Sequence, residues 1–371
     1  MPGEVRLVRA TAAQSIEANK RSHVEWAKGL SVDEYLSREE TLGRCKVAQG
    51  LLAWVLIPRS APTDTLDFFC ACETYRRRLF AHAPRLGQPG QSLEGIGYGI
   101  CSVFTPQRYR GKGYAGQMMK LLHAKLAKPG TSPFASDAQD GDDEDGPRDA
   151  TLSVLYSDAG TFYQAHGWTI IGALHTIWPV QSVALEVKPQ LSTERLDDGM
   201  INSCAKQDVA ATQRQVYTSA DTAFAFVPTG DEQQWLVTRS KFYHEHLPAR
   251  RGHSPPTTFG ARVITDHADS LESHSASEYA VWNYDYSGSE LNILRLRVNS
   301  PEALEALMVV AVECAREQEC QTITAWNVDT GLLKSAGLVS QTKKSSLPAL
   351  AIYDDHLRGA DWLVNENLFW C

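Results

Sequence analysis

Several features that define large protein classes are scarce in this sequence of 371 residues. No stretch approaches the roughly 20 apolar residues that a membrane-spanning helix requires, and the first residues, MPGEVRLVRAT, lack the apolar core of a signal peptide. The 36 Lys and Arg are outnumbered by 44 Asp and Glu and form no basic stripe of the kind that binds nucleic acid. We therefore expect a cytoplasmic protein that binds neither membranes nor nucleic acids.

Cysteine spacing is the next absence. The eight cysteines show neither the paired CxxC spacing of zinc ribbons nor the density of a secreted disulfide scaffold, so we expect reduced thiols and no metal site. What is present is ordinary: 43% hydrophobic and 22% charged residues, enough for a sizeable core. The length suits one large domain or two of medium size.

The first half of the chain alternates helical and strand patterns. Gly97 and Gly99 predict a bulge or a close backbone approach in their strand. The expected elements are two helices within 11–43, the second capped by Ser31; strands over 52–57, 66–75 and 96–104, with a Pro/Gly-rich loop at 84–90; a helix over 110–127; a strand over 150–155; a short helix over 157–166 ended by Gly167; and a strand over 168–174. Residues 128–149 read as a flexible acidic insertion without a functional role, since six acids lie between Asp137 and Asp145.

The second half repeats this order in weaker form. Residues 186–256 are mixed, with helices expected near 207–216 and 231–246. Strands at 279–284 and 291–298, a helix at 301–318, a strand at 322–326 and a short helix at 331–336 follow, and LLKSAGL at 332–338 matches FYQAHGW at 162–168. We predict an α+β protein of two related domains, 1–185 and 186–371, with the apolar C-terminal tail docked on the second.

The segment ICSVFTPQRYRGKGYAGQMMKLL, residues 100–122, carries the most chemical information. A strand that leads through a glycine-rich turn into a helix points successive backbone N–H groups and the helix dipole at one place, which suits a pyrophosphate. The spacing matches neither the nucleoside-triphosphate loop GxxxxGK[ST] nor the dinucleotide fingerprint GxGxxG. It fits a different phosphate-binding loop.

Two motifs in order resemble the GNAT acetyltransferase superfamily. Arg108-x-x-Gly111-x-Gly113, or Arg110-x-x-Gly113-x-Ala115 in the other register, is similar to its acyl-CoA loop, and Tyr163-Gln-Ala-His-Gly167-Trp168 is similar to its later helix end. With KGLSVDEYLSREETL, AWVLIP, CETYRR, SVLYSDAGTFYQAHGW and the terminal DWLVNENLFWC, the chain looks like the fungal lysine N6-acetyltransferase family. This resemblance implies a GNAT fold in the first half and a degenerate GNAT-like second half.

The resemblance also implies acetyl-CoA as cosubstrate and direct acetyl transfer to an amine. Val103, Phe104 and Thr105 would hold the pantetheine arm, with the Val103 N–H a candidate donor to the oxyanion. The residues implied to bind the pyrophosphate are Arg108, Arg110, Gly111, Lys112, Gly113, Tyr114 and Ala115. The second half, which has Leu333 in place of Tyr163 and no glycine loop, should bind no CoA.

Tyr163 is the candidate general acid, because a phenol near the CoA sulfur could protonate the leaving thiolate; a packed core tyrosine is the alternative. Glu73, a polar residue inside an apolar strand, and His175 are candidate bases or substrate-binding residues. Glu73 could equally be an edge-strand or salt-bridged carboxylate facing Arg76 or Arg77. The carboxylate of Cys371 is a further candidate, by similarity to the N-myristoyltransferases.

The family implies the side-chain amine of free L-lysine as acceptor, in lysine breakdown. Another amine, such as a polyamine, another amino acid or a protein lysine, is the first alternative, and a non-catalytic CoA-binding sensor is the second. An arginine would suit the carboxylate of an amino acid through paired hydrogen bonds. A closed pocket with one arginine would therefore favour an amino acid, and an open acidic groove a peptide or polyamine.

Overall fold

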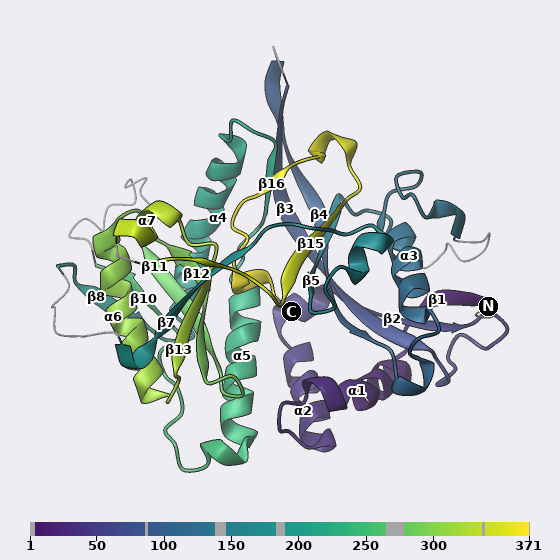
Figure 1. Ribbon diagram of the computed structural model, residues 1–371, viewed down its shortest axis with the longest axis horizontal. Helices are drawn as coiled ribbons and strands as arrows, with labels where there is room; N and C mark the ends of the chain where they lie inside the picture. Colours follow the sequence, from purple (N-terminus) through teal and green to yellow (C-terminus); the bar gives the residue numbers. More distant parts are fainter. Residues whose placement is uncertain are drawn as a thin grey trace.

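Two β-sheets stand side by side, with helices between and around them (Figure 1). The computed structural model describes residues 4–85, 88–137, 146–182, 190–264, 278–335 and 338–370. Helices α4 (Ile201–Tyr217) and α5 (Asp231–His246) lie between the sheets, and the yellow C-terminal segment also reaches this central region (Figure 1). This α+β architecture confirms the predicted fold class.

The first sheet is built mainly from the N-terminal half. Strand β4 pairs antiparallel with β3 and parallel with β5, so that β4 is a central strand. The sheet order is β1 (Val5–Arg9), β2 (Leu51–Pro58), β3 (Cys70–Arg85), β4 (Gln88–Phe104), β5 (Leu152–Ser157), β15 (Leu347–Ile352) and β6 (Thr169–Ile170), with β9 (Ala223–Phe226) joining β3 and β16 (Asp361–Trp362) joining β9.

The second sheet repeats the central motif of the first. Strands β12 and β13 run parallel and are joined by helix α6 (Pro301–Glu317), as β4 and β5 are joined by α3 (Tyr114–Leu126). The sheet order is β14 (Gln341–Thr342), β7 (Leu174–Pro179), β13 (Thr322–Trp326), β12 (Glu290–Arg297), β11 (Tyr279–Asp285), β10 (Gly260–Val263) and β8 (Thr193–Leu196). This shared motif agrees with the expected repetition.

Each half contributes strands to the sheet of the other half. Strand β7 comes from the N-terminal half but pairs with β13 in the second sheet. Strands β9, β15 and β16 come from the C-terminal half but belong to the first sheet. The boundary at residue 185 stays a prediction, because residues 183–189 lie outside the described part of the chain.

The helices begin where the sequence places caps. Thr11 starts α1 (Ala12–Trp26), and Ser31 starts α2 (Val32–Gly43) with Glu34 completing a capping box. The short helix α7 (Thr330–Ser335) follows β13. Its expected end at Ala336 lies outside the described residues, as do the acids of the insertion between 138 and 145.

The prediction of a loop at 84–90 is wrong. Strands β3 and β4 run on to Arg85 and from Gln88 and pair along almost their whole length. Pro84 lies where the register shifts between Ala83 and Arg85, and an irregularity of this kind tolerates the missing N–H of proline. The arginines after Tyr75 likewise continue β3 instead of ending it, with Arg77 buried between two more exposed neighbours.

Three further expectations need correction. The strand over Val5–Arg9 was not anticipated, and only a short 3₁₀ helix, η4 (Phe162–His166), forms where a helix from Ser157 was expected. The bulge in β4 falls at Ser102 (φ +52°), where the register with β3 shifts, and not at the glycines. The other alternative expected for the glycines, a close approach, is confirmed at Gly97, because a Cβ there would lie 2.5 Å from Phe226 Cε1.

The C-terminal tail is part of the core. Leu368 and Phe369 in the 3₁₀ helix η8 (Asn367–Phe369) are fully buried, and the Phe369 carbonyl accepts a 2.7 Å hydrogen bond from Arg77 Nη1. Glu366 accepts from the Leu296 N–H of β12 at 2.7 Å and pairs with Arg295. The tail therefore joins both sheets. Cys371, the hypothetical terminal base, lies outside the described residues.

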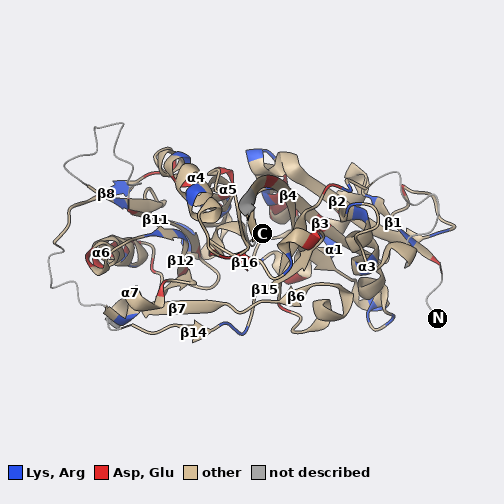
Figure 2. Cartoon of the chain, turned by 90° about the horizontal axis from the view of Figure 1, so that it is seen from above, with Lys and Arg blue, Asp and Glu red and all other residues tan. Residues whose placement is uncertain are grey.

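Charged residues of both signs are interspersed over both halves (Figure 2). Helices long and apolar enough to cross a membrane are absent from the described residues. In the same part of the chain, His, Cys, Asp and Glu form no group of three or more that could hold a metal ion.

Candidate active site

The parting of strands β4 and β5 creates the site. These parallel strands pair only over Gly97–Ile100 and Leu152–Leu155, although they continue to Phe104 and Ser157. The bulge at Ser102 bends β4 at the point where the pairing stops. Cys101, Ser102 and Val103 therefore line a cavity of about 670 Å³ that extends to the second sheet.

Both halves of the chain contribute charged groups to this cavity. The acidic lining residues are Glu39, Glu73, Asp158, Asp285 and Glu290, and the basic ones are Lys28, Arg38, Arg239 and Lys343. A wall of mixed charge suits a ligand that itself carries both signs. The cavity has the volume of a small-molecule site.

Glu73 lies on β3 between β2 and β4, so it is not on an edge strand. Its carboxylate accepts a 2.7 Å hydrogen bond from Ser102 Oγ at the bulge. Burial and the nearby Glu39 carboxylate raise the pKa of Glu73 to about 7, against the lowering effects of Ser102 and Arg38. Such a carboxylate can exchange a proton near neutral pH, as a general base must.

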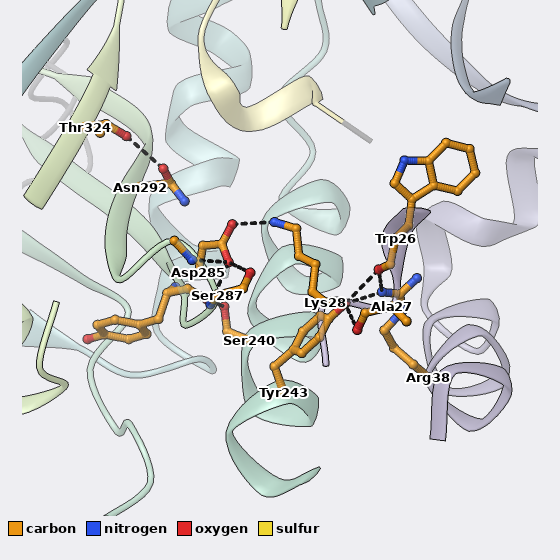
Figure 3. A network of polar contacts seen from close by, with 12 residues as sticks. Trp26, Ala27, Lys28, Arg38, Ser240, Tyr243, Asp285, Ser287, Asn292 and Thr324 are labelled. Carbon is orange, nitrogen blue, oxygen red and sulfur yellow. Dashed lines mark hydrogen bonds and ion pairs between the residues drawn. The ribbon is translucent and has the colours of Figure 1, made fainter. Parts of the chain in front are cut away.

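Arg76 and Arg77 have partners elsewhere. Arg76 pairs with Asp149 at 2.8 Å, and Arg77 donates to the Phe369 carbonyl. The cation that does act on Glu73 is Arg38 of α2, which also pairs with Glu39. Arg38 donates to the Trp26 carbonyl at 3.1 Å and to the Tyr243 hydroxyl of α5 (Figure 3).

Tyr163 lies in η4 and lines the cavity beside Leu155, Tyr156 and Asp158. Burial, with lesser effects from Cys72 and Asp158, raises the pKa of the Tyr163 phenol well above its ordinary value. The hydroxyl therefore keeps its proton at neutral pH and is available as a donor. Its ring packs against the core of the first sheet.

His175 and Lys343 form the opposite wall. His175 on β7 lines the cavity, and burial together with the Lys343 charge lowers its pKa, so the imidazole is neutral at pH 7. The Lys343 ammonium lies 3.3 Å from the centroid of the Trp326 ring. Burial lowers the pKa of Lys343 to about 8. His175 thus adjoins a cation and lies on a different sheet from Glu73.

The glycine loop lies outside the cavity lining, between β4 and α3. Gly111 and Gly113 have φ of +74° and +81°, and a Cβ at either would meet nothing within 4 Å. These glycines therefore serve backbone conformation and not close packing. Gly113 is the N-cap residue of α3 and makes no side-chain cap, which leaves N–H groups of the first helical turn without that partner.

Side chains around this loop hold it in place. Arg110 donates to the Thr105 carbonyl at 2.9 Å and to Glu25 of α1 at 2.8 Å. Tyr114 stacks on Phe69 with centroids 4.1 Å apart, and the Phe104 ring lies edge-on to Trp26. The remaining loop candidates, Lys112 and Ala115, occupy the turn and the first turn of α3, while Arg108 pairs loosely with Asp67 at 3.4 Å.

The lining contains residues that the sequence analysis did not select. Ser102 carried no signal, because a bulge cannot be located from β-strand alternation alone. The sequence did contain a signal for Arg38 and Arg239, because each lies on the apolar face of its helix. Arg38 lies between Tyr35 and Leu42 in α2, and Arg239 lies between Leu236 and Tyr243 in α5. A charged residue at such a position is buried and needs a reason to be there.

Lys28 connects the two halves across the cavity. Its ammonium donates to Asp285 of β11 at 2.7 Å, while its backbone precedes α2 (Figure 3). Burial alone would raise the pKa of Asp285, but the positive charges of Lys28 and Arg239 have the larger combined effect and lower it to about 2. The Asp285 carboxylate is therefore ionised at neutral pH.

Comparison with known proteins agrees with this architecture. The chain is 23% identical to a protein named lysine acetyltransferase from the yeast Yarrowia lipolytica, covering 94% of this chain and 95% of that protein. A probable N-acyltransferase from Enterococcus faecalis has the same fold, with a TM-score of 0.54, 11% identity and coverage of 95% and 73%. So does a GCN5-related N-acetyltransferase from Anabaena variabilis, with a TM-score of 0.54, 12% identity and coverage of 94% and 73%.

The family comparison covers the second half of the molecule. Residues 175–371, more than half of the sequence, match the family described as the LYC1 GNAT-like C-terminal domain. That match begins at β7, the strand with which the chain enters the second sheet. It agrees with the resemblance found in the sequence. This chain therefore belongs to the family of the LYC1 GNAT-like C-terminal domain and is an acetyltransferase with the GNAT fold.

Proposed function

We propose that this protein transfers the acetyl group of acetyl-CoA to the side-chain amine of free L-lysine, giving N6-acetyl-L-lysine and CoA. One observation carries the proposal: a single cavity holds a carboxylate suited to act as base, a protonated phenol, and a second-half arginine, Arg239, that makes no ion pair among the described residues. The yeast relative named lysine acetyltransferase supports the same amine.

The residues of the first half fit acetyl-CoA. Beyond Ile100, β4 is no longer paired with β5, so backbone groups of Cys101–Val103 can bond a pantetheine arm in the manner of a strand. The uncapped start of α3 suits the pyrophosphate, with Arg108, Arg110 and Lys112 nearby. Acetyl-CoA supplies the thioester whose carbonyl the amine attacks.

Glu73 and Tyr163 would divide the proton transfers between them. A lysine side chain has a pKa of about 10.4, so it enters as an ammonium and must lose a proton before attack. Glu73 takes that proton, directly or through water, and the Val103 N–H stabilises the developing oxyanion. As the C–N bond forms and the C–S bond breaks, the Tyr163 hydroxyl donates its proton to the leaving thiolate. The second proton, which leaves the attacking nitrogen as the amide forms, passes through water to the Tyr163 phenolate and restores the hydroxyl.

The charge of the cavity favours an amino acid over a polyamine or a peptide. Two arginines line it, and Arg38 is already paired with Glu39. Arg239 is not in an ion pair within the described residues, so a cation remains for an acceptor's carboxylate. A polyamine has no carboxylate that could pair with this cation, and the α-carboxyl group of a lysine inside a peptide is part of an amide bond.

The test is thiol release from acetyl-CoA by the purified protein, with free L-lysine, spermidine and a lysine-containing peptide compared side by side. We expect saturable turnover with free lysine and acetylation at N6, located by mass spectrometry. Preference for spermidine or the peptide would refute the acceptor while leaving acetyl transfer intact. Tight binding of acetyl-CoA without turnover of any amine would indicate a CoA-binding sensor instead.

A further inference from the structure

In the part of the chain that the structure describes, two buried polar side chains on the second-half wall of the cavity have no hydrogen-bond partner. They are Arg239 of α5 and Asn283 of β11, which are 8% and 3% exposed. Among the described residues, neither has a hydrogen bond or an ion pair, and Asn283 Oδ1 is a buried acceptor without a donor. Leaving such groups unsatisfied is costly unless water or a ligand supplies the missing hydrogen bonds.

Within the described ranges, the Arg239 guanidinium contacts two aromatic rings but donates no hydrogen bond to an acceptor atom. Its guanidinium lies 5.1 Å from the Tyr243 ring centroid and 5.4 Å from that of Trp370. Contacts of this kind with aromatic rings use none of the five N–H groups of the guanidinium. The N–H donors therefore remain free for a planar anion, and a carboxylate is the anion that their geometry fits best.

Helix α5 packs against strand β11, and Arg239 and Asn283 line the cavity from these two elements. Ser240, next to Arg239, donates through Oγ to the Tyr284 carbonyl at 2.9 Å and accepts from the Tyr284 N–H at 3.0 Å. Tyr284 is the neighbour of Asn283. These two bonds fix the register of helix against strand, and Figure 3 shows Ser240 and Asp285 close together beside Tyr243.

Asp285 is on the same face of β11 as Asn283, because residues two apart along a strand point the same way. Its carboxylate is already engaged: Oδ2 accepts from Lys28, and Oδ1 accepts from the Ser287 and Gly288 N–H groups. It thus supplies negative charge at this wall without offering a free oxygen. An ammonium group placed against Asn283 Oδ1 would benefit from that charge.

We propose that Arg239 and Asn283 form the subsite that recognises the α-carbon end of the acceptor, Arg239 binding the α-carboxylate and Asn283 Oδ1 the α-ammonium. This inference rests on the proposed function, since it assigns the part of lysine that does not react. Glu73 on the first sheet then receives the other end of the molecule. The first half performs the transfer, and the second half selects a free amino acid.

The experiment uses two lysine analogues that each lack one group. Cadaverine lacks the carboxylate, and 6-aminohexanoate lacks the α-amine. For Arg239→Gln we expect the KM for lysine and for 6-aminohexanoate to rise roughly 10- to 100-fold, with that for cadaverine unchanged. Where an analogue is not turned over, its inhibition constant against lysine replaces the KM. Unchanged KM for lysine in Arg239→Gln overturns the assignment.

Substitution of Asn283 should affect the two analogues in the opposite way to substitution of Arg239. For Asn283→Ala we expect weaker binding of lysine and cadaverine, roughly 10-fold, with 6-aminohexanoate unaffected, whereas Asn283→Asp keeps an acceptor and retains lysine binding. Equal losses for all three amines in either variant would mean a merely structural role and would refute the subsite. The unaffected analogue in each case also proves that the variant is folded.

The matched control is Arg195→Gln. Arg195 pairs with Glu313 and Glu317 on the outside of the second sheet, so its loss removes an arginine without touching the cavity. The unmodified protein separates the two proposals. If it does not acetylate free lysine, the proposed function fails; if it does, and Arg239→Gln leaves the preference for lysine over cadaverine intact, only the subsite fails.

Discussion

The two parallel strand pairs of the molecule share a motif but fill its opening differently. In the first sheet, β4 and β5 part after Ile100, and their opening is part of the cavity. In the second, β12 and β13 pair over Glu290–Asn292 and then part in the same way. There the C-terminal tail enters: Glu366 accepts from the Leu296 N–H, and Asn327 donates to the Asn365 carbonyl.

The N-termini of helices α3 and α6 also differ: the first is open and the second is satisfied by its own chain. The segment before α3 is a glycine loop without a side-chain cap, whereas Ser300 caps α6 by accepting from the Ala303 N–H at 3.2 Å, and Pro301 follows it. The second helix start is therefore satisfied by its own chain. A binding groove in a duplicated fold can be lost simply by filling its open backbone groups from within.

Position 163 and its counterpart 333 should show the largest contrast. Tyr163→Phe removes the proton donor, and we expect kcat to fall roughly 1,000-fold with little change in stability. Leu333, which is 1% exposed, has only a packing role, so Leu333→Ala should cost about 2–5 kcal/mol of unfolding free energy. Steady-state kinetics and chemical denaturation measure the two effects, and full activity of Tyr163→Phe would remove the phenol from the mechanism.

Glu73 should give the second-largest effect. Its pKa of about 7 means that the basic form increases as pH rises through neutrality, so kcat/KM should rise with an apparent pKa near 7. In Glu73→Gln this rise should vanish, with activity at pH 7 lower by roughly 100-fold. Ser102→Ala removes a bond that favours the ionised form, and should shift the midpoint upward. A midpoint unmoved by both changes would assign it to another group.

The role of the glycine loop in binding acetyl-CoA can be tested at Gly113, with Gly130 as a control for backbone strain. Gly113 and Gly130 have φ of +81° and +80°, and a Cβ at either meets nothing within 4 Å. Alanine should cost each about 1–2 kcal/mol of stability through the same backbone strain. Only Gly113→Ala should also raise the KM for acetyl-CoA, by roughly 10-fold. Equal KM values in the two variants would argue against a phosphate-binding role for this loop.

The smallest effect is expected at the cap of the second half. Ser300→Ala removes the hydrogen bond to the Ala303 N–H and should lower the unfolding free energy by about 1 kcal/mol. Acetyl-CoA binding, measured by calorimetry, should keep the affinity and one-to-one stoichiometry of the unmodified protein. A second equivalent of bound acetyl-CoA would show that the opening in the second sheet is functional.

Local patterns predicted much of this fold. Alternation and caps located the α-helices and the longer strands β2 to β5 and β11 to β13, but not the shorter strands β1, β8, β9, β10, β15 and β16. The glycine loop stood between a strand and a helix as expected. Glu73 could be found because it interrupts an apolar strand. The exchange of β7 and β15 between the two sheets could not be predicted from the sequence, because it depends on contacts between segments that are far apart in the chain. The hairpin at Pro84 was missed since a register irregularity tolerates proline. The helix over 231–246 was predicted with the bounds that α5 has, although α5 buries Glu232, Gln233 and Arg239 among its apolar residues.

The exchange of strands bears on how the chain is made. The first sheet receives β15, residues 347–352, from near the end of the sequence, and β15 separates β5 from β6. On a ribosome, β5 would therefore wait with an unpaired edge until nearly the whole chain has emerged. We expect a fragment ending at residue 185 to be prone to aggregation, and the two halves to mature together as a single folding unit.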